Sequence, residues 1–574
     1  MASISLPLPL RRRRWQLDGP TIGYTVLLGV LALLVLYPIV TVVLSSFQTS
    51  RPGQAATWSL DAWRVALGDP SMVQAVWNTI LLMLAQHGLS LPIAIILAWV
   101  LARTDLPGAH WLEFAFWIAF FLPALPVTLG WILLLDPEYG LLNQVVAAIP
   151  FVGHGVFNIY SFWGIVWAHI AHSSIAVKVM LLTPAFRNLD ASLEEASRVS
   201  GSSTLGTVWR VVVPVMAPAL LVVALLSAIH SMQAFEVEAI LGPPFQFFIF
   251  STKVYRLINQ EPPLFAAATA LSTSVLVLVL PLIFLQRWMT TRRSYTTVSG
   301  QFRGGKVRLG RWRGPVFAAV LGTALLVTVV PFTFLLLGTF MKLFGFFNLP
   351  APWTTEHWGR VFADPIFLTS VRNTLAIAFG TAIVAVAVFS LVAYVAVRTR
   401  YGARGAIDFI SWFPSTLPGI ILGLGLLWVF LGNPLLRSMY GTLAILIIAT
   451  VISTMTLGVQ IIKSHLVQFS FELEEAARIG GGGWWHVYQH VILPLLTPVL
   501  LLVGAVSFIS AARNVSTVAL LATSGTRPLS LLQLDFMVEG RYEAAAVVGV
   551  IVVLLTTGIA LIARIFGLRL GVRD

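Results

Sequence analysis

Long apolar runs alternate with short polar connections along the whole chain. Twelve runs are each about as long as the ~20 residues that a helix needs to cross the hydrocarbon core of a bilayer. The first six lie at approximately 22–46, 74–102, 111–135, 160–182, 214–235 and 264–286. The second six lie at approximately 315–340, 373–397, 407–431, 441–462, 494–512 and 542–563. The pattern therefore predicts an all-α polytopic membrane protein with about twelve transmembrane helices.

The composition agrees with this prediction and excludes several other classes. Of 574 residues, 58% are hydrophobic and only 10% are charged, whereas a soluble domain carries roughly 25% charged residues. A chain this poor in charge is neither a soluble enzyme nor a disordered regulator. It contains no cysteine, which also excludes a disulfide scaffold and a thiolate metal site.

The charges that remain are mostly basic, with 36 Lys and Arg against 23 Asp and Glu. They lie mainly in short loops between apolar runs, which is how membrane topology is encoded, so we expect no nucleic acid partner. Arg11–Arg14 precede the first run, and Arg103, Arg187, Arg398 and the basic segment 287–314 fall on the same predicted side. The distribution predicts a multi-pass membrane protein with both termini in the cytoplasm.

The chain contains two copies of one repeated sequence unit. Asn78-Thr79 and Arg103-Thr104 in the first half recur as Asn373-Thr374 and Arg398-Thr399, both 295 positions later. We divide the chain into a first half at 1–286, a basic cytoplasmic linker at 287–314 and a second half at 315–574. Because each half holds an even number of spans, the two repeats have the same orientation in the membrane.

The closest internal match lies in two polar loops, at about 187–213 and 464–493. Leu193–Gly201 recurs as Leu473–Gly481, 280 positions later and without a gap. Acidic residues at the start and a glycine at the end predict a short helix in each loop, outside the bilayer. Pro214 and Pro494 are expected in the first turn of the next span.

These loops carry a recognisable motif: Glu-Ala-Ala, three residues, Gly, nine residues, then Ile-x-Leu-Pro. Glu475-Ala476-Ala477, Gly481 and Leu493-Pro494 fit the spacing, and Glu195-Ala196-Ser197, Gly201 and Val213-Pro214 fit it with conservative changes. The pattern resembles that of the inner-membrane permeases of type I binding-protein-dependent ABC importers, in a form that fuses both halves in one chain.

The resemblance implies a place in the bacterial inner membrane, a function and a set of partners. Each short loop helix would be a coupling helix that docks on one of two copies of a cytoplasmic ABC ATPase, and a periplasmic binding protein would deliver the substrate. The chain itself would be non-catalytic and would bind no cofactor, with ATP and Mg²⁺ on the ATPase. The residues implied in coupling are Glu194, Glu195, Ala196, Gly201, Glu474, Glu475, Ala476 and Gly481.

The substrate is suggested by two outward segments. Ala234–Gly242 and Arg513–Thr517 resemble the iron(III) branch of these permeases, so ferric iron is the expected cargo. Thiamine, polyamine and phosphonate importers look broadly similar and stay as alternatives. An ion-coupled secondary transporter is a lower-ranked alternative, since two parallel six-span halves also occur in that class.

Ionisable residues near membrane depth are costly and usually functional. Candidates for the substrate pathway on this ground, with one serine at a matching position, are Glu236, Glu238, His169, His230, Arg513 and Ser516. Ferric ion favours oxygen ligands, but the sequence assigns no metal-ligand set.

A purely structural role for these residues is the alternative. The two glutamates would then pair with Lys253, Arg256 or Arg513, and the histidines would be buried and hydrogen-bonded. We expect Lys178 to extend towards the cytoplasmic end of its helix.

Overall fold

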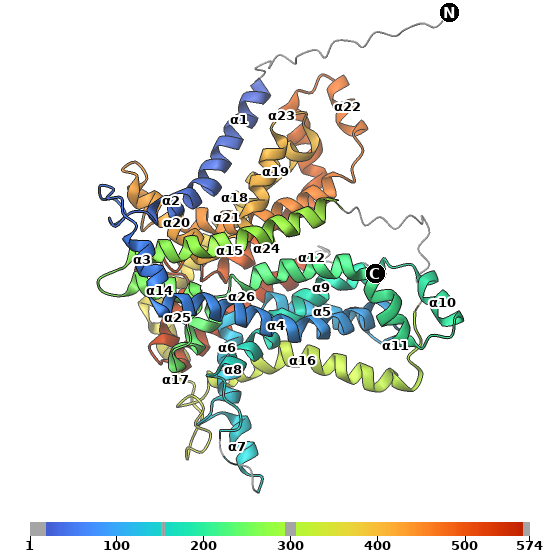
Figure 1. Ribbon diagram of the computed structural model, residues 1–574, viewed down its shortest axis with the longest axis vertical. Helices are drawn as coiled ribbons and strands as arrows, with labels where there is room; N and C mark the ends of the chain where they lie inside the picture. Colours follow the sequence, from blue (N-terminus) through green and yellow to red (C-terminus); the bar gives the residue numbers. More distant parts are fainter. Residues whose placement is uncertain (1–18, 151–152, 154, 293–305, 566–574) are drawn as a thin grey trace, which may run out of the picture.

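The computed structural model describes residues 19–150, 153, 155–292 and 306–565, and every regular element in these ranges is a helix. Ten of the described helices are long and apolar enough to cross a membrane, and two bent helix pairs raise the number to as many as twelve. The predicted all-α membrane fold is therefore confirmed (Figure 1). Arg11–Arg14 and linker residues 293–305 lie outside the described residues.

The first half contains six spans with short helices between them. The first span is α1 (Gly19–Leu31), a π-helical turn and α2 (Tyr37–Ser45), and the second is α4 (Pro70–Arg103). The others are the pair α5 (Ala109–Phe121) and α6 (Ala124–Leu135), then α8 (Phe162–His169) with α9 (Ile175–Arg187), α12 (Val213–Ser231) and α15 (Phe265–Arg292). The connecting helices are α3 (Asp61–Gly68), α7 (Leu141–Ala147), α10 (Ala191–Val199), α11 (Thr204–Thr207), α13 (Glu236–Leu241) and α14 (Phe250–Asn259).

The second half repeats this order. Its spans are α16 (Arg313–Gly338), α18 (Pro365–Arg398), the pair α19 (Arg404–Trp412) and α20 (Gly419–Gly432), α21 (Leu443–Leu466), α24 (Leu493–Ala512) and α26 (Tyr542–Ile565). Its connecting helices are α17 (Glu356–Ala363), α22 (Glu472–Ile479), α23 (Trp484–Val487) and α25 (Leu529–Val538). The helices α4 and α18 are both 34 residues long, which agrees with the sequence repeat.

The third span of each half is broken rather than continuous. The chain bends by 100° between the two helices of the pair in the first half and by 114° in the second. Leu122 and Pro123 at the first break, and Leu417 and Pro418 at the second, have extended backbone. Proline donates no backbone hydrogen bond and disfavours helix at the residue before it, which explains why the runs 111–135 and 407–431 bend at these positions.

The first span of each half packs on the broken span of the other half: α2 on α20, and α16 on α5 and α6. A Cβ atom at Gly130 would lie 2.1 Å from the carbonyl oxygen of Pro331, and one at Gly425 would lie 2.7 Å from that of Pro38. Both glycines are therefore needed for the close approach of the backbones. In a bilayer, small residues of this kind allow the van der Waals packing that holds helices together.

Two sides of the molecule carry different short helices. In Figure 1, α10 and α22 lie towards the right, whereas α3, α14 and α25 lie towards the left. We call these the α10–α22 side and the α14–α25 side. The first corresponds to the predicted cytoplasmic side and the second to the predicted periplasmic side.

The repeated Asn-Thr pairs hold the helices of the α14–α25 side. Thr79 Oγ1 accepts a hydrogen bond from the first backbone N–H of α14 at 3.1 Å, and Thr374 Oγ1 accepts one from the first N–H of α25 at 2.7 Å. The amide of Asn78 donates to Phe248 O at 2.9 Å, and that of Asn373 to Gly525 O at 3.0 Å. Each second span therefore positions one helix of this side.

Pro214 and Pro494 lie in the first turns of α12 and α24, as expected. The helical path nevertheless starts earlier, at Thr204 and Trp484, and reaches them through π-helical turns at Val208–Val212 and Tyr488–Ile492. Proline lacks an N–H and clashes with the preceding turn of an α-helix. A π turn just before each proline keeps the helix continuous at that point.

The close backbone contacts at Gly130 and Gly425 lead to a test of how the two halves pack. Gly130→Ala and Gly425→Ala should each destabilise the protein by about 1–3 kcal/mol or more, because the added methyl overlaps a backbone oxygen. The measurement is the midpoint of denaturant unfolding of the full chain in lipid nanodiscs. Gly322→Ala is the matched control, since nothing lies within 4 Å of its Cβ position. An equal midpoint in all three variants would contradict the packing described here.

Candidate functional site

A chamber of about 370 Å³ lies between the two halves. Both halves contribute to its wall through their broken third spans, their fourth and fifth spans and the segments that follow the fifth spans. Of the predicted pathway residues, His169, His230, Glu236, Arg513 and Ser516 line it, whereas Glu238 does not. The fold thus brings five of six candidates from distant parts of the sequence to one space.

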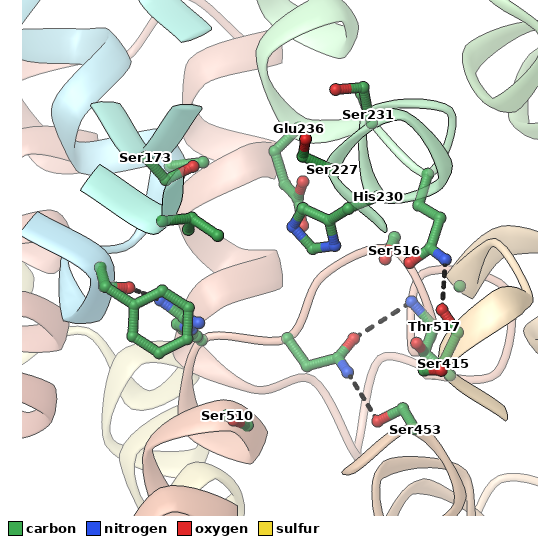
Figure 2. Close-up of a pocket in the computed structure, with 18 of the residues that line it drawn as sticks. Ser173, Ser227, His230, Ser231, Glu236, Ser415, Ser453, Ser510, Ser516 and Thr517 are labelled. Atoms are coloured by element: carbon green, nitrogen blue, oxygen red, sulfur yellow. Dashed lines mark hydrogen bonds between the residues drawn. The ribbon is translucent and has the colours of Figure 1, made fainter. Parts of the chain in front are cut away.

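Hydroxyl groups dominate the polar part of the chamber wall. Figure 2 shows several of them around His230 and Glu236. The serine and threonine side chains that line the chamber are Ser173, Ser174, Ser227, Ser231, Ser415, Ser453, Thr454, Ser510, Ser516 and Thr517. The amides of Gln86, Gln233 and Asn514 add further donors and acceptors.

Both breaks expose backbone carbonyls at the chamber, and each half satisfies one in the other. Arg513 Nη1 donates to Phe120 O at 2.5 Å, and Gln233 Nε2 donates to Ser415 O at 2.7 Å. Phe120 and Ser415 are related by the repeat offset of 295 positions, and Gln233 and Arg513 by the offset of 280. Non-helical backbone at membrane depth is tolerated only when it is satisfied in this way.

The histidines of the fourth span lie at a π-helical turn, Ile170–Ser174. His172 Nε2 lies 2.8 Å from Leu122 O, so it acts on the same break as Arg513. His169 Nε2 lies 2.5 Å from Glu238 Oε1. π-Helical turns within α-helices are frequent at functional sites, and this one turns both imidazoles towards the chamber wall.

The partners expected for the glutamates are only partly found. Glu238 is fully buried and bonds His169, not a lysine or arginine. Lys253 instead donates to Ser71 Oγ at 2.6 Å, and the Arg256 guanidinium lies over the ring of Phe248. Glu238 thus holds His169 in place from outside the chamber.

The side chain of Lys178 does not extend as the sequence pattern suggested. Its side chain does not reach the cytoplasmic end of its helix: it is 1% exposed and lines the chamber, where Nζ donates to Ser174 O at 3.0 Å and Ser174 Oγ at 2.8 Å. Snorkelling requires a path to the interface along the helix surface, and here the packing of α9 against α4 and α5 encloses this residue.

The charged groups at the ends of the fifth spans respond to burial. Burial raises the pKa of Glu236 above its ordinary value, and it lowers the pKa of Arg513 to about 10. Each shift disfavours the charged form, but Arg513 stays protonated at neutral pH. Within the described ranges, no group of three or more His, Cys, Asp or Glu side chains could hold a metal ion.

On the α10–α22 side, the repeated loops form the predicted short helices. α10 ends at Val199 and α22 ends at Ile479, and Gly201 and Gly481 follow with φ of +85° and +87°. Ser202 N bonds Ser197 O at 3.1 Å, and Gly482 N bonds Ala477 O at 3.0 Å. These bonds and left-handed glycines form a helix C-cap that only glycine adopts without strain.

A buried ion pair anchors each of these helices to the end of a second span. Arg103 Nε bonds Glu194 Oε1 at 3.1 Å, and Arg398 Nε lies 3.4 Å from Glu474 Oε1. All four side chains are at most 5% exposed. The sequence assigned Glu194 and Glu474 to coupling but missed Arg103 and Arg398 as their partners, although opposite charges repeated in both halves were a usable signal.

The neighbouring residues of α10 and α22 face away from the protein. Glu195, Ala196, Glu475 and Ala476 are exposed. Large apolar side chains on the same helices are exposed too: Val199 is 89% exposed and Ile479 is 88% exposed. Apolar groups that face outwards on both repeated helices are typical of a binding surface.

Comparison with known proteins identifies the family. A sequence profile of the binding-protein-dependent transport system inner membrane component matches residues 71–295 and 394–572. The chain belongs to this family. As a family member it is a permease component of an ABC importer, so membership decides against the ion-coupled secondary transporter.

The individual relatives are named for different substrates. The ferric transport system permease protein FbpB of Actinobacillus pleuropneumoniae is 27% identical over 406 residues, which cover 70% of this chain and 58% of the relative. A relative from Haemophilus influenzae, also named for ferric transport, is 28% identical over 64% of this chain and 58% of its own length. The chain therefore spans less than two thirds of these relatives. The maltose/maltodextrin permease MalG of Escherichia coli is 26% identical over 46% of this chain and 91% of the relative.

Among solved structures, a bacterial ABC transporter involved in alginate import is similar, with a TM-score of 0.40 and 16% identity. The similarity covers 48% of this chain and 96% of that one. It is too distant for a comparison of sites.

The anchoring ion pairs lead to a second prediction. Glu194→Ala and Glu474→Ala should each destabilise the permease by about 3–5 kcal/mol, because each leaves a buried arginine unpaired. Glu195→Ala and Glu475→Ala are matched controls on the exposed positions next to them and should change stability by about 0.5 kcal/mol or less. Denaturant midpoints of the purified chain in nanodiscs provide the measurement. If the exposed pair proves as costly as the buried pair, the assigned anchoring role is wrong.

Proposed function

We propose that this permease imports ferric iron by alternating access, with α10 and α22 as the coupling helices of two copies of a cytoplasmic ABC ATPase. In this proposal a periplasmic binding protein delivers iron to the α14–α25 side, and both termini are cytoplasmic. ATP and Mg²⁺ bind on the ATPase. The chain provides the pathway and the docking helices.

The coupling role is supported by the two equivalent ion pairs that attach α10 and α22 to the second spans. Two helices of the same sequence pattern lie on the same side of the molecule (Figure 1), and a buried ion pair attaches each to the end of a 34-residue span. Their outer surfaces expose Val199 and Ile479 at equivalent positions. A push on either helix would therefore reach the second span through a short, enclosed contact.

Iron is supported by the relatives named for ferric transport and by the outward segments Ala234–Gly242 and Arg513–Thr517. Thiamine, polyamines and phosphonates are the alternative substrates.

Coupling is tested in the assembled importer, reconstituted with its ATPase and binding protein. The double variant Val199→Glu/Ile479→Glu should lose substrate-stimulated ATP hydrolysis by about ten-fold or more, because two charges would be buried against the partner. Ile565→Glu, at an 81% exposed position on α26, is the matched control and should keep full stimulation. Normal coupling in the double variant would show that α10 and α22 are not the docking helices.

The substrate is tested separately with the wild-type complex. Ferric iron loaded on the binding protein should stimulate ATP hydrolysis and accumulate inside proteoliposomes. Thiamine, spermidine and a phosphonate serve as parallel substrates. Stimulation by one of these three in place of iron would refute the iron assignment and leave the coupling assignment intact.

A further inference from the structure

The chamber between the halves contains positive charge that the hydrogen bonds to the broken spans do not require. Gln233 and Arg513 occupy equivalent positions and perform the same task, which is to donate a hydrogen bond to a broken span of the other half. The neutral amide of Gln233 satisfies Ser415 O as well as Arg513 satisfies Phe120 O. The guanidinium of Arg513 also lies over the ring of Phe120, 5.1 Å from its centroid, but the hydrogen bond to the broken span does not itself need a charge.

Lys178 supplies a second cation. It is almost completely buried, and its amine bonds only the carbonyl and hydroxyl oxygens of Ser174. Within the described part of the chain, no carboxylate oxygen lies within 4.0 Å of Lys178 or Arg513 to form an ion pair. Glu236 attracts Arg513 electrostatically without forming an ion pair, but one carboxyl group does not balance two cations. A buried charge that is not fully balanced is unfavourable, and an anion in the chamber would offset that cost.

The chamber contains fewer negatively charged than positively charged side chains. Glu236 is the one carboxylate among the described residues that line it, and burial raises its pKa. Glu238 lies behind the wall and is bonded to His169. The corresponding fourth span of the second half contributes Ser453, Thr454 and Leu457 to the chamber, so it adds no charge.

The remaining polar lining suits an oxygen-rich anion. Ten hydroxyl side chains and three amides line the chamber, and such groups donate to carboxylate and phosphate oxygens. A bare ferric ion would meet two cations, and the described residues offer it no group of three His, Cys, Asp or Glu ligands. Repulsion from Lys178 and Arg513 therefore opposes entry of the free cation.

We propose that this chamber binds a small anion with several carboxylate or phosphate oxygens, and that ferric iron passes through it wrapped in such an anion. The iron part rests on the proposed function, whereas the anion site does not. Lys178 and Arg513 would neutralise the ligand charge, and the hydroxyl groups would bond its outer oxygens.

Binding is measured by calorimetry on the full chain in lipid nanodiscs, without ATPase or binding protein. The probes are citrate, inorganic phosphate and ferric citrate, with glucose as a neutral probe and spermidine as a cationic one. We expect the anionic probes to bind, and to bind more weakly as salt is added. Arg513→Gln and Lys178→Met should each weaken this binding by about ten-fold or more, the effect of losing one charge-assisted hydrogen bond.

One stability measurement and two further variants separate charge from folding. Arg513→Gln places at 513 the residue that donates the equivalent hydrogen bond at 233, so its unfolding midpoint should stay close to that of the wild type, with only the small loss of the contact with the Phe120 ring. Lys178→Arg retains the charge and should retain binding even if Lys178→Met is unstable. Lys253→Met, outside the chamber on α14, is the control that should bind as the wild type does.

Several outcomes would overturn the proposal. Glucose or spermidine binding as tightly as citrate would overturn it, as would unchanged citrate and phosphate affinity in Arg513→Gln. Citrate or phosphate binding without ferric citrate binding would support the anion site and refute the iron complex. Iron-stimulated ATP hydrolysis by the assembled importer, with no anion binding by the chain, would refute this inference and leave the proposed function standing.

Discussion

Backbone carbonyls that a broken helix leaves unpaired must be satisfied inside the protein, because the hydrocarbon core offers no water to bond them. This constraint organises the centre of the permease. Both third spans break at proline-containing turns, and each break is completed by a side chain of the other half, Arg513 for Phe120 and Gln233 for Ser415. The halves are therefore joined by hydrogen bonds at the place where the backbone of both is irregular, and the chamber lies at the same place.

The second spans connect this centre to both ends of the molecule. At one end of α4, Asn78 and Thr79 bond the segment that begins α14. In the middle, Gln86 lines the chamber. At the other end, Arg103 holds α10 through Glu194. One long helix thus contacts the segment that begins α14, lines part of the chamber and holds α10, so a displacement at α10 has a direct structural route to the chamber.

The two halves share their framework but not their charges. The anchoring ion pairs, the Asn-Thr contacts, the glycine crossings and the π turns before Pro214 and Pro494 all occur twice. In the chamber, however, Lys178 and Glu236 come from the first half and Arg513 from the second. Their approximate counterparts, such as Gln233 and Ser516, are neutral. Symmetry is kept in the framework of the two halves, and it is lost among the charged side chains that line the chamber.

The sequence by itself determined the membrane class, the repeat, the helices α10 and α22 and five of the residues that line the chamber, because hydrophobic length, glycine spacing and scarce charges are properties of local sequence. Only the tertiary structure decided what these residues contact. The packing of each first span on the broken span of the other half depends on the close approach of Gly130 to Pro331 and of Gly425 to Pro38. Lys178 faces the chamber because neighbouring helices enclose it. Glu238 is separated from Glu236 by the packing of α13, although the two are neighbours in sequence. Contacts between residues hundreds of positions apart depend on the packing of whole spans, which no local pattern records.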